Sequence, residues 1–408
     1  MKHHSGFIPC TLGLLLTSLL LCACGGGGSE QKTTTTYPAA TMQPSDTQAS
    51  DATALVMRYL ARLSNDEISG VLAGQNAGHG DQILNTSGTV GYAPLLEALQ
   101  TQTGELPAIV GLDYEYDRIF TPEQLSAANQ KLIAHWQAGG LVTINWSPNN
   151  PWWNDESDLV HNIGGGDLTR TYGGDMTAVD LNALSDSSKT IHTVWLRKLD
   201  RIATALQELQ NAGVVVLWRP MQEMNGNWFW WGISTQASSS QCLAYKKLWA
   251  DMYTYFTQDK GLHNLLWVYS PNRGPLTSDE SRAIANVDWC YPGANYVDVV
   301  AGTRYDDSLS IDDYNRYREF GKPLGMGEYG PTLAGAAATA GSYDTRNYAA
   351  VLGQYPAIAY WVSWHDWMNS DGSREHQALV GNQHVSELFQ QSSIITQSRV
   401  NLHAGMSE

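Results

Sequence analysis

The chain has 408 residues, with 24 Lys and Arg against 40 Asp and Glu, so its formal net charge is −16. A hydrophobic fraction of 43% excludes general disorder, and the acidic surplus argues against nucleic acid or an anionic membrane surface as a partner, since both select clustered Lys and Arg. The 15 Trp and 20 Tyr beside only 6 Phe favour surfaces that are half apolar and half wet, as sugar faces are.

Residues 1–23 are predicted to be an export signal. Lys2 provides the positive charge, and the apolar run over 12–21 is too short for an ordinary membrane-spanning helix. The run Leu21-Cys22-Ala23-Cys24 resembles a bacterial lipobox, which implies cleavage before Cys24 and lipidation of its thiol. Because Gly25 rather than Asp follows, we expect a lipoprotein of the outer membrane or cell surface; ordinary secretion or a periplasmic location is the alternative.

Residues 24–50 are rich in Gly, Thr and Ser and are predicted to be a flexible tether, followed by one folded domain over 51–408. In that domain Cys242 and Cys290 are the only cysteines. An exported chain permits a disulfide between them, and two buried free thiols are the alternative. The sequence has no C-x-x-C pair and no H-E-x-x-H, so no metal site is predicted.

Eight apolar runs in the domain alternate with helical patterns and are predicted to be strands. Two helices are marked by their ends: one over 122–138, with Thr121 as its cap, and one over 196–211, with Gly213 after it. This alternation predicts a parallel sheet, and eight strands in one series favour a single (β/α)₈ TIM barrel. No nucleotide-binding glycine motif occurs, so no cofactor is expected. The predicted strands are 70–75, 108–114, 141–146, 214–221, 265–270, 297–305, 323–328 and 358–364.

The chemistry of such barrels lies at the carboxyl ends of the strands. Glu223 follows the fourth predicted strand and Glu328 ends the seventh. Glycosidic cleavage needs two carboxyl groups, one to protonate the leaving oxygen and one to attack carbon or activate water. Either Glu alone could be a solvated loop acid, but together they favour hydrolysis of a sugar polymer. Carboxylates, amides and indoles crowd these strand ends, over 113–117, 146–153, 219–226, 304–305, 327–330 and 364–367.

A specific resemblance is carried by the fourth strand and the loop after it. Residues 218–232 read W-R-P-M-Q-E-M-N-G-N-W-F-W-W-G, which is similar to the signature of glycoside hydrolase family 26. P-L-G-M-G-E-Y-G from Pro323 and Y-P-G-A-N-Y-V-D-V-V from Tyr291 fit the same family in the same order. The resemblance implies a (β/α)₈ retaining hydrolase of clan A. Endo-β-1,4-mannanases are the commonest members, and mixed-linkage β-glucanases and β-1,3-xylanases are minorities.

The resemblance also implies roles for individual residues. Glu223 resembles the family's acid/base and Glu328 its nucleophile. Tyr305 falls where a Tyr hydrogen-bonds the nucleophile, Trp364 where an indole forms the floor under the reacting sugar, and Arg219 where a guanidinium would keep the nucleophile ionised. Barrel packing is the alternative for the indoles of the fourth-strand motif. The remaining residues expected to bind substrate are Asp113, Trp146, Asn149, Gln222, Asn225, Trp228 and Trp231.

Two positions depart from the family pattern. Gln222 stands where a His usually precedes the acid/base, and Ser147 stands where a His often follows the third-strand Trp. Because both carboxylates are kept, these changes put the substrate in doubt rather than the reaction. The sequence therefore predicts a monomeric retaining endo-β-glycanase acting on β-1,4-mannan or glucomannan. The alternatives are the same chemistry on mixed-linkage glucan, β-xylan or an exopolysaccharide, or a glycan-binding lipoprotein without activity.

Overall fold

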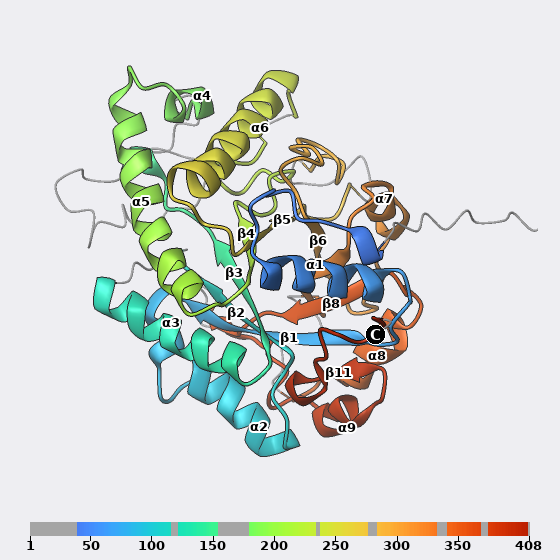
Figure 1. Ribbon diagram of the computed structural model, residues 1–408. Coiled ribbons are helices and arrows are strands. Elements are labelled where there is room, and N and C mark those ends of the chain that lie inside the picture. Colours follow the sequence, from blue (N-terminus) through green and yellow to red (C-terminus); the bar gives the residue numbers. More distant parts are fainter. Residues whose placement is uncertain are drawn as a thin grey trace, which may run out of the picture. The chain divides into compact units, whose positions relative to one another are not determined.

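The computed structural model describes residues 39–115, 121–153, 179–233, 237–275, 284–332, 341–368 and 374–406. Eight parallel strands follow one another in chain order around a barrel, which closes because β1 pairs with β8 (Figure 1). The predicted (β/α)₈ barrel is therefore confirmed. The strands are β1 (Val71–His79), β2 (Ile109–Asp113), β3 (Leu141–Trp146), β4 (Val216–Pro220), β5 (Leu265–Tyr269), β6 (Val299–Tyr305), β7 (Leu324–Gly330) and β8 (Ile358–Ser363).

Helices follow the strands along the chain, and three further strands are short. β11 extends the sheet by pairing with the start of β1, and β9 and β10 form a two-stranded hairpin after β8. The helices are α1 (Asp51–Ser64), α2 (Ala98–Thr103), α3 (Pro122–Gln137), α4 (Leu181–Leu184), α5 (Thr190–Asn211), α6 (Ser239–Thr254), α7 (Tyr314–Glu319), α8 (Arg346–Leu352) and α9 (Val385–Gln390). The short strands are β9 (Trp367–Met368), β10 (Arg374–Glu375) and β11 (Ile394–Ile395).

Most predicted element boundaries agree with the structure, and the largest differences are at the start of α5 and at the end of β1. Thr121 caps α3 as predicted, in a reciprocal capping box with Gln124. α5 begins at Thr190 rather than at Leu196. β1 continues past its predicted end at Gln75 as far as His79. The polar side chains that mark a strand end in the sequence are satisfied inside the barrel: Gln75 Nε2 donates to the Trp364 carbonyl at 2.9 Å.

Helix α1 closes the end of the barrel at which the strands begin. Its apolar face, which includes Leu60, packs with Ile109, Leu266 and other residues near the strand starts, in one buried cluster (Figure 1). The Ser64 hydroxyl accepts a hydrogen bond from the first amide of β7 at 2.9 Å. Arg62 Nη2 donates to the Leu402 carbonyl at 2.7 Å, so the C-terminal segment is held at the same end. The opposite end, where the strands finish, is left as the mouth.

The folded body begins earlier than the sequence predicts. The Ser45 amide donates to Asp298 Oδ1 at 2.5 Å, and Asp46 lies 2.7 Å from His263 Nδ1. Ala39 is fully buried. Residues 39–50 therefore pack on the barrel, which corrects the part of the predicted tether, 24–50, that lies within the described residues. The predicted signal and Cys24 lie outside them.

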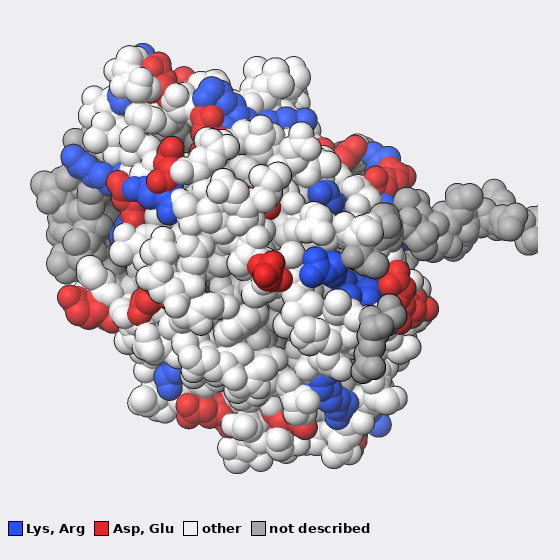
Figure 2. All heavy atoms as spheres, in the orientation of Figure 1, with Lys and Arg blue, Asp and Glu red and all other residues white. Residues whose placement is uncertain are grey.

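On the face drawn in Figure 2, Lys and Arg are scattered among Asp and Glu and form no continuous patch. Arg316, for example, lies 2.7 Å from Asp288 and 2.9 Å from Glu319. Exposed pairs of this kind contribute about 0–1 kcal/mol each, so the buried clusters dominate stability. Among the helices in the described ranges, none combines the length and apolar character needed to cross a bilayer.

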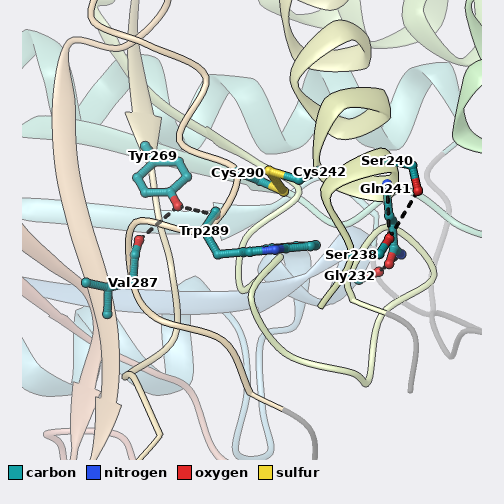
Figure 3. Close-up of a disulfide and its surroundings, with 9 residues drawn as sticks. All are labelled: Gly232, Ser238, Ser240, Gln241, Cys242, Tyr269, Val287, Trp289 and Cys290. Carbon is teal, nitrogen blue, oxygen red and sulfur yellow. Dashed lines mark hydrogen bonds between the residues drawn. A yellow bond between two sulfur atoms is a disulfide. The ribbon is translucent and has the colours of Figure 1, made fainter. Parts of the chain in front are cut away.

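A disulfide joins Cys242 in the first turn of α6 to Cys290 in the segment before β6, with 4.9 Å between the two Cα atoms (Figure 3). The same segment is held from β5, since the Tyr269 hydroxyl contacts the carbonyl oxygens of Val287 and Trp289 at 2.9 and 2.8 Å. Of the two possibilities that the sequence leaves open, the structure shows the disulfide.

Removing this disulfide should lower the free energy of unfolding. The cross-link joins positions 48 residues apart, so its loss frees a long loop in the unfolded chain, which costs about 2–4 kcal/mol. The measurement is urea unfolding of Cys242→Ser/Cys290→Ser against the oxidised wild type, with reduced wild type as the control. The prediction would be contradicted if the double variant and the reduced wild type both had the same free energy of unfolding as the oxidised wild type.

Candidate active site

The two predicted catalytic carboxylates both lie at the mouth of the barrel. Glu223 follows β4 and Glu328 lies within β7 near its carboxyl end. They are 8% and 7% exposed, so each is largely buried and still reachable from solvent. This combination allows a carboxyl group to touch a substrate while its protonation is set by the protein.

Glu328 is held by a cation and a hydroxyl. Arg219 Nη1 donates to Oε1 at 2.8 Å, and the Tyr305 hydroxyl donates to Oε2 at 2.9 Å. The remaining guanidinium nitrogens of Arg219 donate to Ser270 Oγ at 2.7 Å and Thr303 Oγ1 at 2.9 Å, so the cation itself cannot turn. These charge-assisted bonds keep both carboxylate oxygens in place.

A glycine next to Glu328 makes room for this cation. A Cβ atom at Gly327 would lie 2.5 Å from Arg219 Nε, closer than two such atoms can approach. The family-like G-M-G-E run thus has a steric reason at its second glycine: any side chain there would displace the guanidinium from Glu328.

Glu223 is held in a strained turn. Its φ is 57°, and the φ of Met221 is 47°, a left-handed conformation that residues other than Gly seldom adopt. The Glu223 amide donates to the Ser270 carbonyl at 2.7 Å. Trp228 Nε1 donates to Oε2 at 2.6 Å, and Asn272 Nδ2 donates to Oε1 at 2.9 Å. The turn and the two donors fix the direction in which the carboxyl group points.

The environment makes Glu223 a weak acid suited to neutral pH. Burial and, second, the negative charge of Glu328 raise the pKa of Glu223 to about 7, against the opposing effects of Arg219 and the two donors. Glu328 in contrast is paired with a cation. One carboxyl group with a raised pKa near another that is paired with a cation is the arrangement expected of a catalytic acid and a nucleophile.

The Glu223 pKa predicts an alkaline limit to activity. Only protonated Glu223 can donate to a leaving oxygen, so kcat/KM should fall about tenfold per pH unit above a pKa of about 7, because kcat/KM reports the free enzyme. The measurement is kcat/KM from pH 5 to 9 on one soluble substrate. A flat profile to pH 9 would contradict this assignment.

A family model, Glycosyl hydrolase family 26, matches residues 45–399. The chain belongs to glycosyl hydrolase family 26. Mannan endo-1,4-beta-mannosidase A and B of Caldalkalibacillus mannanilyticus is 35% identical over 81% of this chain, and the chain spans 59% of that protein. Mannan endo-1,4-beta-mannosidase of Bacillus subtilis is 31% identical over 84% of this chain and 87% of its own length. A solved Bacillus subtilis mannanase is 28% identical, covers 88% of this chain and 96% of its own, and superposes with a TM-score of 0.68.

Three further indoles of this family 26 chain that were expected to bind substrate differ in their exposure to solvent. Trp364 is 6% exposed and lies beside His79, with ring centroids 6.0 Å apart, so it borders the mouth. Trp146 and Trp231 are fully buried. Trp146 stacks on Trp195, with centroids 5.3 Å apart, and Trp231 donates to the Gln222 carbonyl at 2.7 Å. The structure places these two indoles behind the site, where they pack, and not at its surface.

The side chain of Asn225 forms hydrogen bonds with backbone groups of other segments. Its side-chain oxygen accepts from the Asn272 amide at 2.8 Å, and its nitrogen donates to the carbonyls of Asn272 at 2.9 Å and Ala285 at 3.0 Å. Asn225 thus fastens the loop that carries Glu223 to the segment that the disulfide holds.

Asn149 is fully buried at the β3 end, and Asp113 is bonded to Ser147 there. Tyr116 and Asp117, also noted at a strand end, lie outside the described residues.

Four residues that shape the site were not predicted from the sequence. Ser270 and Asn272 follow β5, whose end offered a signal of the same kind as the other strand ends, and Thr303 lies within β6. His79 ends β1 and lies edge to face with His365, with 4.3 Å between the ring centroids; the sequence gives no signal for it because the apolar pattern predicts that β1 ends at Gln75. Within the described residues no three His, Cys, Asp or Glu side chains are grouped as a metal site would need.

Proposed function

We propose that this protein is a retaining endo-β-1,4-mannanase acting on mannan or glucomannan. One observation carries the proposal: Glu328 is ion-paired to Arg219 while the nearby Glu223 has a pKa raised to about 7. The family and the two relatives named mannan endo-1,4-beta-mannosidase support the substrate.

The two carboxyl groups divide the reaction into two displacements. Glu328 attacks the anomeric carbon while Glu223 gives its proton to the leaving glycosidic oxygen, which leaves a glycosyl ester on Glu328. Esterification removes the negative charge that helped to raise the Glu223 pKa. Glu223 is therefore a carboxylate when water enters, takes a proton from that water, and the ester is hydrolysed with Glu328 released.

The proposal is tested by the products from a panel of polysaccharides. Mannan and glucomannan should yield oligosaccharides of mixed length early, as internal cleavage requires, and the first-formed sugar should keep the β configuration by NMR. Retention also requires the two carboxyl groups to be about 5–5.5 Å apart. An inverted first product would refute the mechanism, and no cleavage of either mannan would refute the substrate.

A second candidate is the same chemistry on mixed-linkage glucan, β-xylan or an exopolysaccharide. Gln222 and Ser147 favour it, because both stand where the family usually has His. Values of kcat/KM on mannan, glucomannan and mixed-linkage glucan decide between the two. A glycan-binding protein without activity would not need a cation on one carboxylate and a raised pKa on the other.

We also propose that Cys24 carries a lipid and anchors the enzyme at the cell surface or outer membrane. The lipobox-like run before Cys24 supports this. Cys24→Ser should move the protein from the membrane fraction to the soluble fraction or leave its signal uncleaved. Mass spectrometry of the mature N-terminus is the direct measurement, and an unmodified Cys24 in soluble protein would end the proposal.

A further inference from the structure

A chain of buried hydrogen bonds connects the ends of β2, β3 and β4. The Ser147 hydroxyl donates to Asp113 Oδ2 at 2.5 Å, and Gln222 Nε2 donates to Ser147 Oγ at 2.8 Å. The backbone amides of Glu115 and Ser147 donate to the other oxygen of Asp113 at 3.1 and 3.2 Å. Asp113 and Ser147 are fully buried, and Gln222 is 2% exposed.

These bonds can run in only one direction while Asp113 is ionised. A carboxylate accepts and cannot donate, so the one hydroxyl proton of Ser147 is committed to Asp113. Ser147 can then only accept from Gln222, whose NH₂ group must face it. Burial raises the pKa of Asp113, and nearby His79 and the donors from Ser147 and Glu115 oppose that rise.

The direction of the chain leaves an acceptor at its end. Gln222 Oε1 faces away from Ser147, is buried, and has no hydrogen-bond partner among the described residues. A buried carbonyl oxygen without a donor is unfavourable unless a ligand or water supplies one. Gln222 directly precedes Glu223 in the loop after β4, at the end of the barrel where the two carboxylates lie. Asn149, two residues after Ser147, is likewise buried, and neither polar atom of its side chain has a partner within the described part of the chain.

We propose that ionised Asp113, Ser147 and Gln222 form a one-way hydrogen-bond relay that presents the Gln222 amide oxygen to one hydroxyl group of the bound sugar. Gln222 contacts the substrate, and Asp113 and Ser147 are positioning residues. The relay selects sugars with a donor at that position and disfavours a deoxy or fluorine-substituted carbon there. This inference rests on the proposed function and adds the specificity of the site.

The relay can be reversed by one substitution. In Asp113→Asn the side-chain oxygen stays with the two backbone N–H groups, so the new NH₂ faces Ser147 and donates to it. The Ser147 proton is then free for Gln222 Oε1, and the amide turns its NH₂ toward the sugar. Asp113→Asn should therefore exchange an acceptor for a donor at the same place without changing the size of any side chain by a heavy atom.

The test uses two series of activated aryl β-mannobiosides, in which single hydroxyl groups are replaced by hydrogen or by fluorine. In the wild type, one deoxy position should lower kcat/KM by about tenfold more than its neighbours do. Gln222→Met, which keeps the length of the side chain and removes its acceptor, should cancel that extra penalty and leave the penalties at other positions unchanged. Asp113→Asn should keep the deoxy penalty, because a hydroxyl group can also accept a hydrogen bond from the turned amide. It should instead reduce the penalty of fluorine substitution at the same position, because fluorine can accept but cannot donate.

Ser126→Ala is the matched control, since Ser126 donates to Glu208 at 2.7 Å between α3 and α5, on the outside of the barrel. It should change no penalty, and thermal unfolding of each variant checks folding. If Gln222→Met folds and every deoxy penalty stays as in the wild type, the relay is refuted while the proposed function stands. If the wild type cleaves neither mannan nor the parent aryl mannobioside, the proposed function itself fails.

Discussion

Glu328→Ala should lower kcat on mannan and on activated aryl β-mannosides alike, by roughly 10⁵-fold. Without this carboxylate no group can form the glycosyl ester, and Arg219 is left as a buried, unpaired cation beside the reacting carbon. A better leaving group cannot compensate, because the missing partner is the nucleophile. Initial rates on both substrate classes, with pre-steady-state measurement of aryl release, give the result.

Glu319→Ala is the control for this substitution, because Glu319 is an exposed carboxylate on α7. Its activity should stay within about twofold of the wild type, since surface substitutions away from the site have small effects. A Glu328→Ala protein that unfolds at the wild-type temperature and still releases a burst of aryl alcohol would show that another group is the nucleophile.

Glu223→Ala should separate the two substrate classes that Glu328→Ala treats alike. On mannan, kcat should fall roughly 10³-fold, since the leaving oxygen receives no proton. On an aryl glycoside with a good leaving group the first displacement needs no acid, so a burst equal to the enzyme concentration should appear, followed by slow turnover. Added azide, a nucleophile that needs no base, should speed the slow phase and form a β-glycosyl azide.

The assignment of Glu328 as nucleophile and Glu223 as acid/base rests on the different behaviour of the two variants. Equal rates for Glu223→Ala and Glu328→Ala on the activated substrate would contradict it. An α-glycosyl azide would contradict retention. Glu223→Ala should also lose the alkaline limit that the raised pKa of Glu223 imposes on kcat/KM in the wild type.

The sequence predicts the barrel well because several strands, such as β4 with the run that precedes it, are continuous apolar runs, and because α3 and α5 are marked by signals at their ends. It predicts Glu223 and Glu328 because strand ends in such barrels meet at one mouth. The sequence cannot distinguish a polar side chain that faces the active site from one that hydrogen-bonds to the backbone. Asn225 and Asn272 both follow strand ends, yet Asn225 donates to carbonyl oxygens and Asn272 donates to Glu223.

Indoles pose the same difficulty. The run over 228–231 contains three Trp, and only packing decides their directions. Trp228 donates to Glu223 and is partly exposed, whereas Trp230 and Trp231 are fully buried. The Gln222–Ser147–Asp113 chain was out of reach for another reason, because it joins residues 75 and 34 positions apart that meet only once the barrel has closed.

The closed base of the barrel determines how the enzyme can be attached to a support. Residues 45 and 46 and the C-terminal segment around Leu402 are bonded where the strands begin, at the end that α1 covers, and the carboxylates lie at the other end. A lipid, bead or fused module joined to either end of the described chain is thus attached on the side away from the mouth. An immobilised preparation should accept long polymers as readily as the free enzyme does, without the steric exclusion that attachment beside the mouth would cause.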